Sequence, residues 1–215
     1  MEQIPVPAKE RLLYLMRLLE RSEGEGAISS ARIEALTGWA SHTVRKDISF
    51  LSAALEGDNA SFEGGRLGSS GGYEPAALAG LIKKALGLEK RRKFCVVGLG
   101  RLCSAYLNVK EEMEDSGFEL TAGFDTNVNL TEIIKSPVPL YPAYKMGEVI
   151  SRFGIDIALL CVPVEAAQAA AEKLAAAGIR GILNFAQAHI TVPHGITVRN
   201  VYLTDELRAL SIKMG

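Results

Sequence analysis

The stretch that most restricts how this chain can fold runs from Lys93 to Ala105 and reads Lys-Phe-Cys-Val-Val-Gly-Leu-Gly-Arg-Leu-Cys-Ser-Ala. Its apolar residues 94–97 predict a buried parallel strand that ends at Gly98, and a helix is expected from about Arg101. Gly98 can adopt the tight turn, and Gly100 lets a ligand approach the backbone closely. The N–H groups at the start of the helix favour a phosphate. The stretch therefore predicts a nucleotide-binding strand, turn and helix.

A carboxylate stands where a dinucleotide-binding fold needs one. Asp125 ends the next apolar run, residues 120–124, and lies 22 residues after Cys103. In such folds an Asp or Glu at this point accepts a hydrogen bond from the ribose 2′-hydroxyl. Cys103 itself occupies the third position of the glycine motif, where Gly or Ala is usual. The pattern predicts a Rossmann-like domain. The alternative is the same fold with an empty pocket or a pocket for another nucleotide.

Charge gives no sign of a general nucleic-acid-binding surface. The chain carries 24 Lys and Arg against 25 Asp and Glu, for a net charge of −1. Contact with DNA therefore requires a local basic patch. The N-terminus lacks a basic segment followed by an apolar one, and no apolar run reaches membrane length. We expect a cytoplasmic protein with no membrane partner.

The three cysteines, Cys95, Cys103 and Cys161, are widely separated and lack the spacing of metal ligands, so no metal site is expected. Cys95 and Cys161 lie in apolar strand runs and are interpreted as small core residues. Cys103 is interpreted as a packing residue of the glycine motif. Its alternative role is that of a redox-active thiol at the start of a helix.

Helical periodicity before residue 90 predicts helices over residues 8–21, 30–36, 41–55 and 74–88. The first is expected to place Leu12, Leu15 or Met16, and Leu19 on one apolar face. The second and third are joined by Thr37-Gly38-Trp39, which is typical of a helix-turn-helix. Residues 56–72 are rich in Gly, Ser and acidic side chains and predict a flexible hairpin or wing. Its one basic residue, Arg66, is expected to contact DNA. A charged linker, residues 89–93, follows, so the domain boundary is expected near Leu88.

The predicted helix over residues 41–55 has opposite apolar and polar faces. Its buried stripe is expected to contain Val44, Ile48, Leu51 and Leu55, and Ser41 is expected to cap it. The residues expected to contact DNA from this helix are Ser41, His42, Thr43, Arg45, Lys46 and Ser49. Arg45 and Lys46 suit phosphates or guanine edges, and the hydroxyls suit backbone oxygens. The alternative is a dimerisation or adaptor domain whose basic pair is merely solvated.

Beyond Asp125, predicted strands and helices alternate. Residues 126–136 are expected to be irregular and residues 137–140 extended; strands are expected over 155–162, 179–185 and 196–201, and helices over 143–153, 165–177 and 204–213. This alternation predicts a doubly wound parallel sheet in the α/β class. The ligand crevice then lies at the carboxyl ends of the strands. No Ser/His/Asp or Tyr/Lys combination stands at a recognisable spacing. His189 and His194 lie in loop-like sequence, where a histidine is more often solvated than catalytic. We therefore predict a binding protein rather than an enzyme.

Several short segments along the whole chain form a recognisable combination. They are Ile4-Pro5, Arg11-Leu12, Tyr14, Val44 to Phe50, Gly72-Tyr73, Val97 to Leu102, Phe124-Asp125, Val162-Pro163, Ala166 to Gln168 and Gly181 to Ala186. In these segments the chain resembles the Rex family of redox-sensing transcriptional repressors. The resemblance implies a winged helix-turn-helix domain (1–88), a Rossmann-like NAD(H)-binding domain (89–203) and a C-terminal helix (204–215) exchanged between the subunits of a homodimer.

The resemblance also implies a function and a set of cofactor residues. Operator DNA would be bound and then released when NADH replaces NAD⁺. The cofactor residues that it implies are Gly98, Leu99, Gly100, Arg101, Leu102, Asp125, Val162, Pro163, Asn184 and Phe185. The alternative is a divergent Rex-like module that binds another nucleotide, such as CoA, or none. A small oxidoreductase is the third and weakest hypothesis.

Three positions depart from the family pattern. Cys103 replaces the usual Gly or Ala, and Val109 stands where many members have a tyrosine. Tyr202 replaces an aspartate that, in the family, can pair with an arginine of the first helix across the dimer; Arg17 is placed to be that arginine. These departures motivate the alternative of altered or lost redox sensing.

Overall fold

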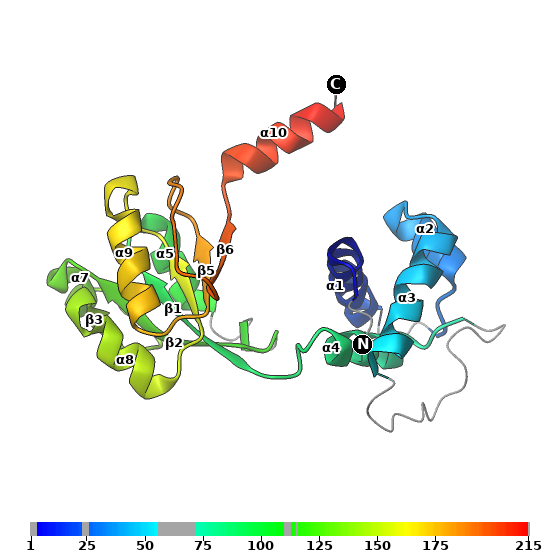
Figure 1. Ribbon diagram of the computed structural model, residues 1–215, viewed down its shortest axis with the longest axis horizontal. Helices are drawn as coiled ribbons and strands as arrows, with labels where there is room; N and C mark the ends of the chain where they lie inside the picture. The colour runs from blue at the N-terminus through cyan, green and yellow to red at the C-terminus, as the bar shows by residue number, and fades with distance from the viewer. Residues whose placement is uncertain (1–3, 23–25, 56–71, 110–112, 115, 215) are drawn as a thin grey trace. The chain divides into compact units, whose positions relative to one another are not determined.

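The computed structural model describes residues 4–22, 26–55, 72–109, 113–114 and 116–214. The chain divides into two compact units, Met1–Lys90 and Arg91–Gly215 (Figure 1). Each has its own buried apolar core.

The first unit is helical over its described residues. Its helices are α1 (Val6–Arg21), α2 (Ser30–Thr37), α3 (Ser41–Leu55) and α4 (Pro75–Ala85). The face predicted for the first helix is confirmed, because α1 buries Leu12, Leu15, Met16 and Leu19. It begins at Val6 rather than at residue 8, since Pro7 is tolerated in a first turn whose N–H groups have no helical partner.

The predicted helix-turn-helix is present. The Ser29 hydroxyl accepts a hydrogen bond from the Arg32 N–H at 3.1 Å and caps α2. Gly38 ends α2 in the left-handed conformation (φ 74°). Then α3 buries Val44, Ile48 and Leu51 as expected. The side chain of Leu55, the fourth predicted member of that stripe, lies outside the described residues.

A short backbone bridge joins the two ends of the segment that contains the predicted wing. Ile28 and Tyr73 exchange antiparallel N–H to carbonyl hydrogen bonds, each of 2.8 Å. The predicted hairpin itself, with Arg66, lies outside the described residues except for Gly72. Helix α4 then starts at Pro75, where the Glu74 carboxylate accepts N–H groups of the first turn, and it ends at Ala85, before the predicted residue 88.

The second unit is built on one parallel six-stranded sheet. Its strands are β1 (Arg92–Val97), β2 (Phe118–Asp125), β3 (Leu140–Pro142), β4 (Ile157–Leu160), β5 (Gly181–Asn184) and β6 (Thr197–Asn200). Their order is β3-β2-β1-β4-β5-β6, and every neighbouring pair is parallel. This is the doubly wound order of dinucleotide-binding folds, and it confirms the predicted fold class. The direction of winding reverses between β1 and β4.

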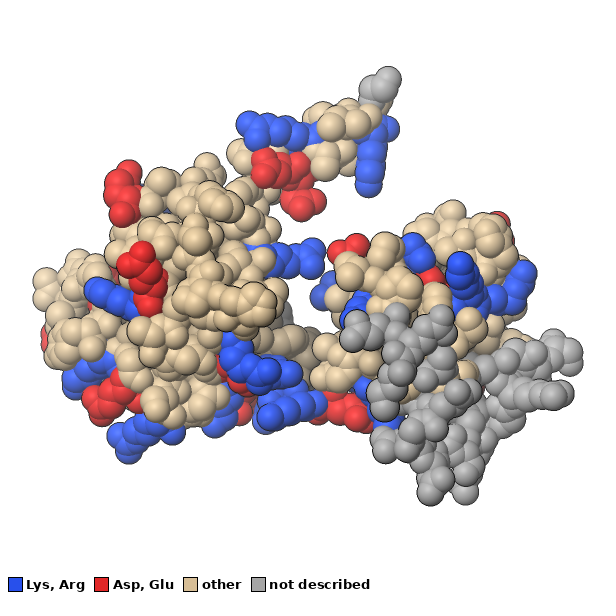
Figure 2. All heavy atoms as spheres, in the orientation of Figure 1, with Lys and Arg blue, Asp and Glu red and all other residues tan. Residues whose placement is uncertain are grey.

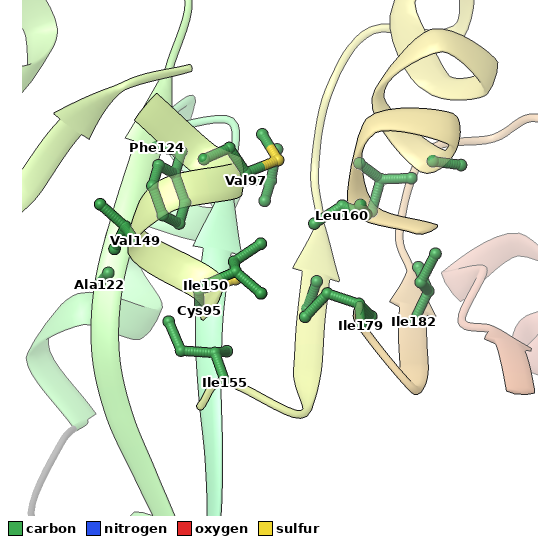
Figure 3. Close-up of a cluster of buried hydrophobic side chains, with 14 of the residues drawn as sticks. Cys95, Val97, Ala122, Phe124, Val149, Ile150, Ile155, Leu160, Ile179 and Ile182 are labelled. Carbon is green, nitrogen blue, oxygen red and sulfur yellow. The ribbon is translucent and has the colours of Figure 1, made fainter. Parts of the chain in front are cut away.

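Both faces of the sheet are buried under helices. Along β1, Cys95 and Val97 face one core cluster, whereas Phe94 and Val96 face the other, as the period of a strand requires. The first cluster lies under α8 (Met146–Phe153) and α9 (Val164–Ala176), and Figure 3 shows Val149 and Ile150 of α8 packed near its strand residues. The second cluster includes Cys103 of α5 (Arg101–Tyr106) and Leu107 of the following 3-10 helix, Leu107–Val109.

Three sequence predictions for this unit were wrong in detail. Residues 126–136 are not irregular throughout, because α7 (Val128–Ile133) forms there, capped by the Asn127 side chain, although it buries no residue. The segment expected to be extended over 137–140 continues to Pro142 as the edge strand β3, where proline is tolerated. Strand β4 covers only Ile157–Leu160 of the predicted 155–162, so Cys161 and Val162 lie beyond its end.

The turn after β1 packs directly on the chain that leaves β4. Gly98 has φ 92°, and a Cβ atom added to it would lie 2.6 Å from the carbonyl oxygen of Cys161. The Gly98 N–H donates to the Phe124 carbonyl of β2, and the Cys161 N–H donates to the Val97 carbonyl, both at 2.8 Å. Glycine is therefore required at position 98 for two independent reasons, conformation and space.

We predict that Gly98→Ala lowers the free energy of unfolding of the second unit by roughly 2–4 kcal/mol, through backbone strain and displacement of the Cys161 carbonyl. Calorimetric thermal unfolding measures this. Gly100→Ala is the matched control, since φ at Gly100 is −64° and no atom lies within 4 Å of an added Cβ. Gly100→Ala should lower the free energy of unfolding by less than about 1 kcal/mol. Equal losses for the two variants would contradict the explanation.

Candidate functional site

The carboxyl ends of four neighbouring strands bring all of the predicted cofactor residues to one edge of the sheet. Residues 98–102 follow β1, Asp125 ends β2, Val162 and Pro163 follow β4, and Asn184 and Phe185 lie at the end of β5. In open parallel sheets this edge binds ligands at the point where the winding reverses, which here is between β1 and β4.

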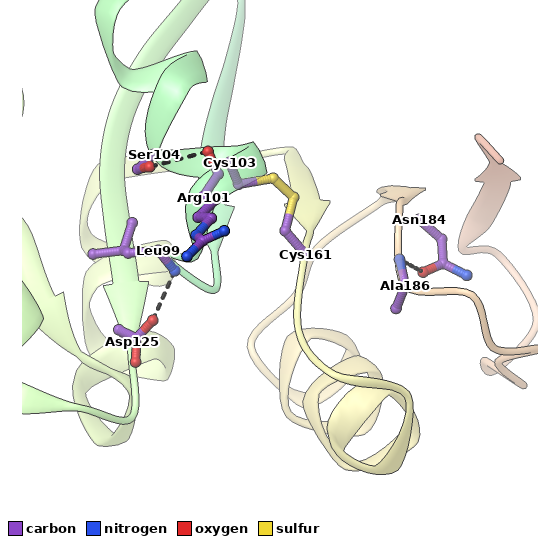
Figure 4. The surroundings of a disulfide bond; sticks show 8 residues. All are labelled: Leu99, Arg101, Cys103, Ser104, Asp125, Cys161, Asn184 and Ala186. Atoms are coloured by element: carbon purple, nitrogen blue, oxygen red, sulfur yellow. Dashed lines mark hydrogen bonds between the residues drawn. A yellow bond between two sulfur atoms is a disulfide. The ribbon is translucent and has the colours of Figure 1, made fainter. Parts of the chain in front are cut away.

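Asp125 is held against the glycine turn. Its Oδ2 accepts the Leu99 N–H at 2.7 Å (Figure 4), and its Oδ1 accepts the Asn127 N–H at 2.8 Å. Each carboxylate oxygen has a second lone pair, so Asp125 can still accept a hydrogen bond from a ligand hydroxyl. Leu99 points into the core, whereas Arg101 and Leu102 are exposed at the start of α5.

The opposite wall follows β4. Val162 is half-buried and packs on the sheet core, and its Cγ1 lies 3.1 Å from where a Cβ of Gly98 would be. Pro163 is exposed and precedes the first residue of α9. The glycine turn and this wall are therefore in direct contact across the switch point.

Asn184 is fully buried and its side chain is engaged within the protein. Its amide nitrogen lies 2.9 Å from the Ala188 carbonyl, 2.9 Å from Asn200 Oδ1 and 3.2 Å from the Tyr202 hydroxyl. Its carbonyl oxygen accepts the Ala186 N–H at 3.0 Å. Its N–H groups are thus used within the protein, and the residue has no exposed surface for a cofactor. The arrangement instead gives Asn184 a positioning role beneath the loop that follows β5.

An aromatic pair, only half of which the sequence reasoning found, lies over the strand ends. The rings of Tyr106 and Phe185 have centroids 5.7 Å apart, and both are half-buried. Tyr106 was not predicted as a site residue. The available signal was helical spacing: Tyr106 follows the buried Cys103 by three residues and so shares its helix face.

Two of the three cysteines are bonded, which the sequence reasoning did not foresee. Cys103 and Cys161 form a disulfide with a Cα–Cα distance of 6.1 Å (Figure 4). Cys161 was interpreted as a small core residue; it does pack against a core cluster, but it is only half-buried and is bonded to Cys103. The available signal was topological, since the two residues follow adjacent strands. Cys95 is free and buried, and burial raises the pKa of its thiol to about 12.

The polar face predicted for α3 is exposed. His42, Arg45, Lys46 and Ser49 are exposed, and Ser41 and Thr43 are half-buried. Figure 2 shows basic side chains over α2 and α3, interspersed with acidic and uncharged ones. Arg45 Nη1 donates to the Ser30 hydroxyl at 3.1 Å, which ties this basic side chain to the start of α2.

Ser41 is not the helix cap that the sequence predicted. The carbonyl of Ala40 accepts the first helical hydrogen bond, from the Val44 N–H at 3.1 Å, so Ser41 is already helical. The Ser41 hydroxyl and N–H both donate to Glu34, and the hydroxyl bond is the main cause that lowers the pKa of the Glu34 carboxyl. To reach a DNA backbone, Ser41 would have to exchange this partner.

Two protein families match separate parts of the chain. Residues 89–188 match the family "CoA binding domain", and residues 3–49 match "Putative DNA-binding protein N-terminus". A redox-sensing transcriptional repressor Rex from Ligilactobacillus salivarius (strain UCC118) is 33% identical over 216 residues, covering 98% of this chain and 94% of the relative. The chain belongs to the Rex family. The predicted family resemblance is thus confirmed.

Solved Rex structures are similar over the whole chain. RSP, a Rex-family repressor, in complex with β-NAD⁺ and operator DNA matches with a TM-score of 0.83 at 29% identity, covering 100% of this chain and 94% of RSP. RSP in complex with β-NADH matches with a TM-score of 0.82 at 28% identity, covering 100% and 95%. The Rex relatives are named as repressors, in agreement with the prediction of a protein that is not an enzyme.

Among the residues described in this Rex chain, no helix has both the length and the apolar character needed to cross a bilayer. Within the same residues, no group of His, Cys, Asp and Glu side chains could hold a metal ion.

Two family segments of this Rex chain are joined by an ion pair. Arg11 of α1 donates to both carboxylate oxygens of Asp47 in α3, at 2.6 and 2.8 Å. Asp47 is only 4% exposed. A two-point bond between a guanidinium and a nearly buried carboxylate sets the orientation of the two helices as well as their spacing. It therefore orients the exposed face of α3.

Asp47→Ala should lower the free energy of unfolding of the first unit by about 2–4 kcal/mol, because it leaves Arg11 without its partner beside the core. Urea unfolding followed by the fluorescence of Trp39, the single tryptophan, reports this. Ser49→Ala on the exposed face of the same helix is the control and should change stability by less than about 0.5 kcal/mol. A loss at Asp47 no larger than at Ser49 would show that the ion pair is not structural.

Proposed function

We propose that this chain is a DNA-binding transcriptional repressor that senses the NADH/NAD⁺ ratio, and that NADH binding releases it from its operator. The observation that carries the proposal is the full-length match to RSP, whose solved complexes hold β-NAD⁺ with operator DNA, or β-NADH. Operator binding would keep the protein with the chromosome, in the cytoplasm.

The cofactor would bind along the crevice between β1 and β4. Its pyrophosphate would lie on the turn at residues 98–102, and Asp125 would accept a hydrogen bond from the adenosine ribose. The same carboxylate would repel a 2′-phosphate, so NAD(H) is favoured over NADP(H). The apolar surface of Val162 and Phe185 suits the neutral dihydronicotinamide ring better than the charged nicotinamide, whose desolvation costs more.

DNA would be bound through the exposed face of α3. Arg45 and Lys46 would contact phosphates or guanine edges in a major groove, with His42, Thr43 and Ser49 beside them. Because the whole chain has a net charge of −1, electrostatic attraction to DNA must come from this local basic surface. Because each phosphate contact releases counterions, operator affinity should fall steeply with salt. For NADH to act, it must bind more tightly to the conformation that does not bind DNA.

The decisive experiment titrates the purified protein with NADH and with NAD⁺ by calorimetry, and measures release of operator DNA by NADH. We expect tighter binding of NADH than of NAD⁺, and Asp125→Ala should weaken both by roughly 10- to 100-fold by removing a charged hydrogen-bond acceptor. Arg45→Ala is the matched control, since it should weaken operator binding and leave NADH affinity unchanged. Binding of neither cofactor to the intact protein would refute the proposal.

A second candidate is a Rex-like module that binds another nucleotide, such as CoA. The match of residues 89–188 to a CoA-binding family and the cysteine at the third motif position favour it. Mass spectrometry of the copurified ligand separates the two functions. Retained CoA, with no response to NADH, would support this second candidate.

The C-terminal helix supports the proposal of a homodimer. Every described residue of α10 (Leu203–Met214) is exposed in the single chain. Its exposed apolar side chains Leu203, Leu207, Leu210 and Met214 recur at the spacing of one helix face. An exposed apolar stripe of this kind marks a surface that is buried against a partner. A second copy of the chain would bury it, as in the dimer implied by the family resemblance.

Replacing Leu207 and Leu210 together by Asp should therefore convert the dimer to a monomer, because two carboxylates would be buried in the interface. Light scattering after size-exclusion chromatography gives the mass directly. Ile133→Asp, at an apolar position of α7 that is 75% exposed, is the control and should stay dimeric. A double variant that keeps the wild-type mass would exclude α10 from the interface.

A further inference from the structure

The disulfide joins the two walls of the nucleotide crevice. Cys103 lies in α5, which follows the glycine turn after β1, and Cys161 is the first residue after β4. Strands β1 and β4 are adjacent and paired in register from Phe94 to Val97. The bond therefore crosses the point at which the winding of the sheet reverses, where a dinucleotide is bound in folds of this order (Figure 4).

The two cysteine residues differ in their exposure. Cys103 is fully buried, whereas Cys161 is only half-buried at the crevice edge. An oxidant from solution therefore reaches Cys161 first, and Cys103 is placed to complete the bond. The third cysteine, Cys95, is fully buried and belongs to the core cluster on the other face of the sheet, so it is a natural internal control.

The geometry suits a bond that forms and breaks. The Cα–Cα distance of 6.1 Å lies inside the range seen in disulfides, so the two residues are close enough to bond. Within the cytoplasm, where the proposed function places this chain, disulfides rarely persist as structural links and are usually transient or redox-sensing. The motif itself does not require a thiol at position 103, since Gly or Ala is the usual residue there.

We propose that Cys103 and Cys161 form a reversible thiol–disulfide switch, and that the oxidised form binds NADH more weakly than the reduced form. This inference rests on the proposed function, because it adds a second redox input to the same crevice. Both inputs would act in one direction, since a low NADH level and oxidised thiols would each keep the repressor on its operator.

The chemistry balances with hydrogen peroxide as the oxidant. The Cys161 thiol gives a sulfenic acid and one water, and the Cys103 thiol then displaces hydroxide from that sulfur to form the disulfide and a second water. The cysteine pair loses two electrons, which the peroxide gains. In the reverse direction a small dithiol attacks one sulfur and releases the other as a thiol; its second thiol then completes the exchange and leaves as a cyclic disulfide.

Oxidation changes the crevice because bonded and non-bonded sulfur atoms need different separations. A disulfide holds them about 2 Å apart, whereas non-bonded heavy atoms prefer roughly 3.5–4 Å. The Cys161 carbonyl is already in close contact with Gly98, so movement at Cys161 is transmitted to the glycine turn. The oxidised walls are drawn together across the space that a dinucleotide must enter, which disfavours binding.

The test compares NADH binding to the reduced and the peroxide-treated full-length protein by calorimetry. Alkylation of the denatured protein counts free thiols, with three expected after reduction and one, Cys95, after oxidation. We expect oxidation to weaken NADH binding about tenfold. Because coupling is reciprocal, saturating NADH should then raise the reduction potential of the pair by about 30 mV.

Variants separate the switch from general oxidative damage. Cys103→Ala, which introduces a residue usual at this motif position, and Cys161→Ser should both abolish the effect of peroxide on NADH affinity. Cys95→Ala should retain it. A response that persists in Cys161→Ser, or that disappears in a well-folded Cys95→Ala protein, would overturn the assignment.

The outcomes also distinguish this inference from the proposed function. Failure of the reduced protein to bind NADH refutes the proposed function and the coupling with it. Disulfide formation with unchanged or tighter NADH binding refutes the coupling alone. Three free thiols after peroxide treatment would show that the pair does not form a disulfide under oxidising conditions, and would overturn the proposal at its first step.

Discussion

The close packing of Gly98 on the Cys161 carbonyl is the contact on which the second unit depends. It places the turn after β1 against the chain leaving β4, and no side chain larger than hydrogen fits between them. Backbone hydrogen bonds then connect the same turn to β2 through Phe124. One glycine therefore sets the relative positions of the glycine turn, the Asp125 carboxylate and the wall at Val162. A crevice shaped by backbone in this way is largely formed before any ligand arrives, which lowers the cost of ordering it on binding.

The first unit depends on a different kind of contact. The bond between Arg11 and Asp47 is directional, so it restricts the rotation of α3 as well as its distance from α1. The apolar stripe of α3 supplies the burial energy, but burial is non-directional and would tolerate small rotations. The polar face of the helix is thus presented by a combination of apolar burial, which holds the helix in place, and one ion pair, which orients it.

The elements that follow from local residue patterns could be predicted from the sequence. Apolar runs at residues 94–97 and 120–124 indicated buried strands, and the spacing of Leu12, Leu15 and Leu19 indicated a helix face, because both patterns follow from backbone geometry alone. Prediction from the sequence failed where a single polar hydrogen bond decides which structure a segment adopts. Helix α7 depends on the Asn127 cap, and Ser41 exchanged its expected capping role for a bond to Glu34, a partner on another helix. Neither the Asn127 cap nor the bond between Ser41 and Glu34 produces a periodic pattern of apolar residues in the sequence.

By itself, the sequence determined the fold class, the family and the order of strand, glycine turn and helix, because these follow from residue types at short spacing. Only the tertiary structure decided which distant residues meet. Asn184 joins Asn200 and Tyr202 in a closed hydrogen-bond network, and Cys103 meets Cys161, because parallel strands far apart in sequence end side by side. The physical reason is that such contacts depend on the three-dimensional path of the chain, which no local pattern of side chains encodes.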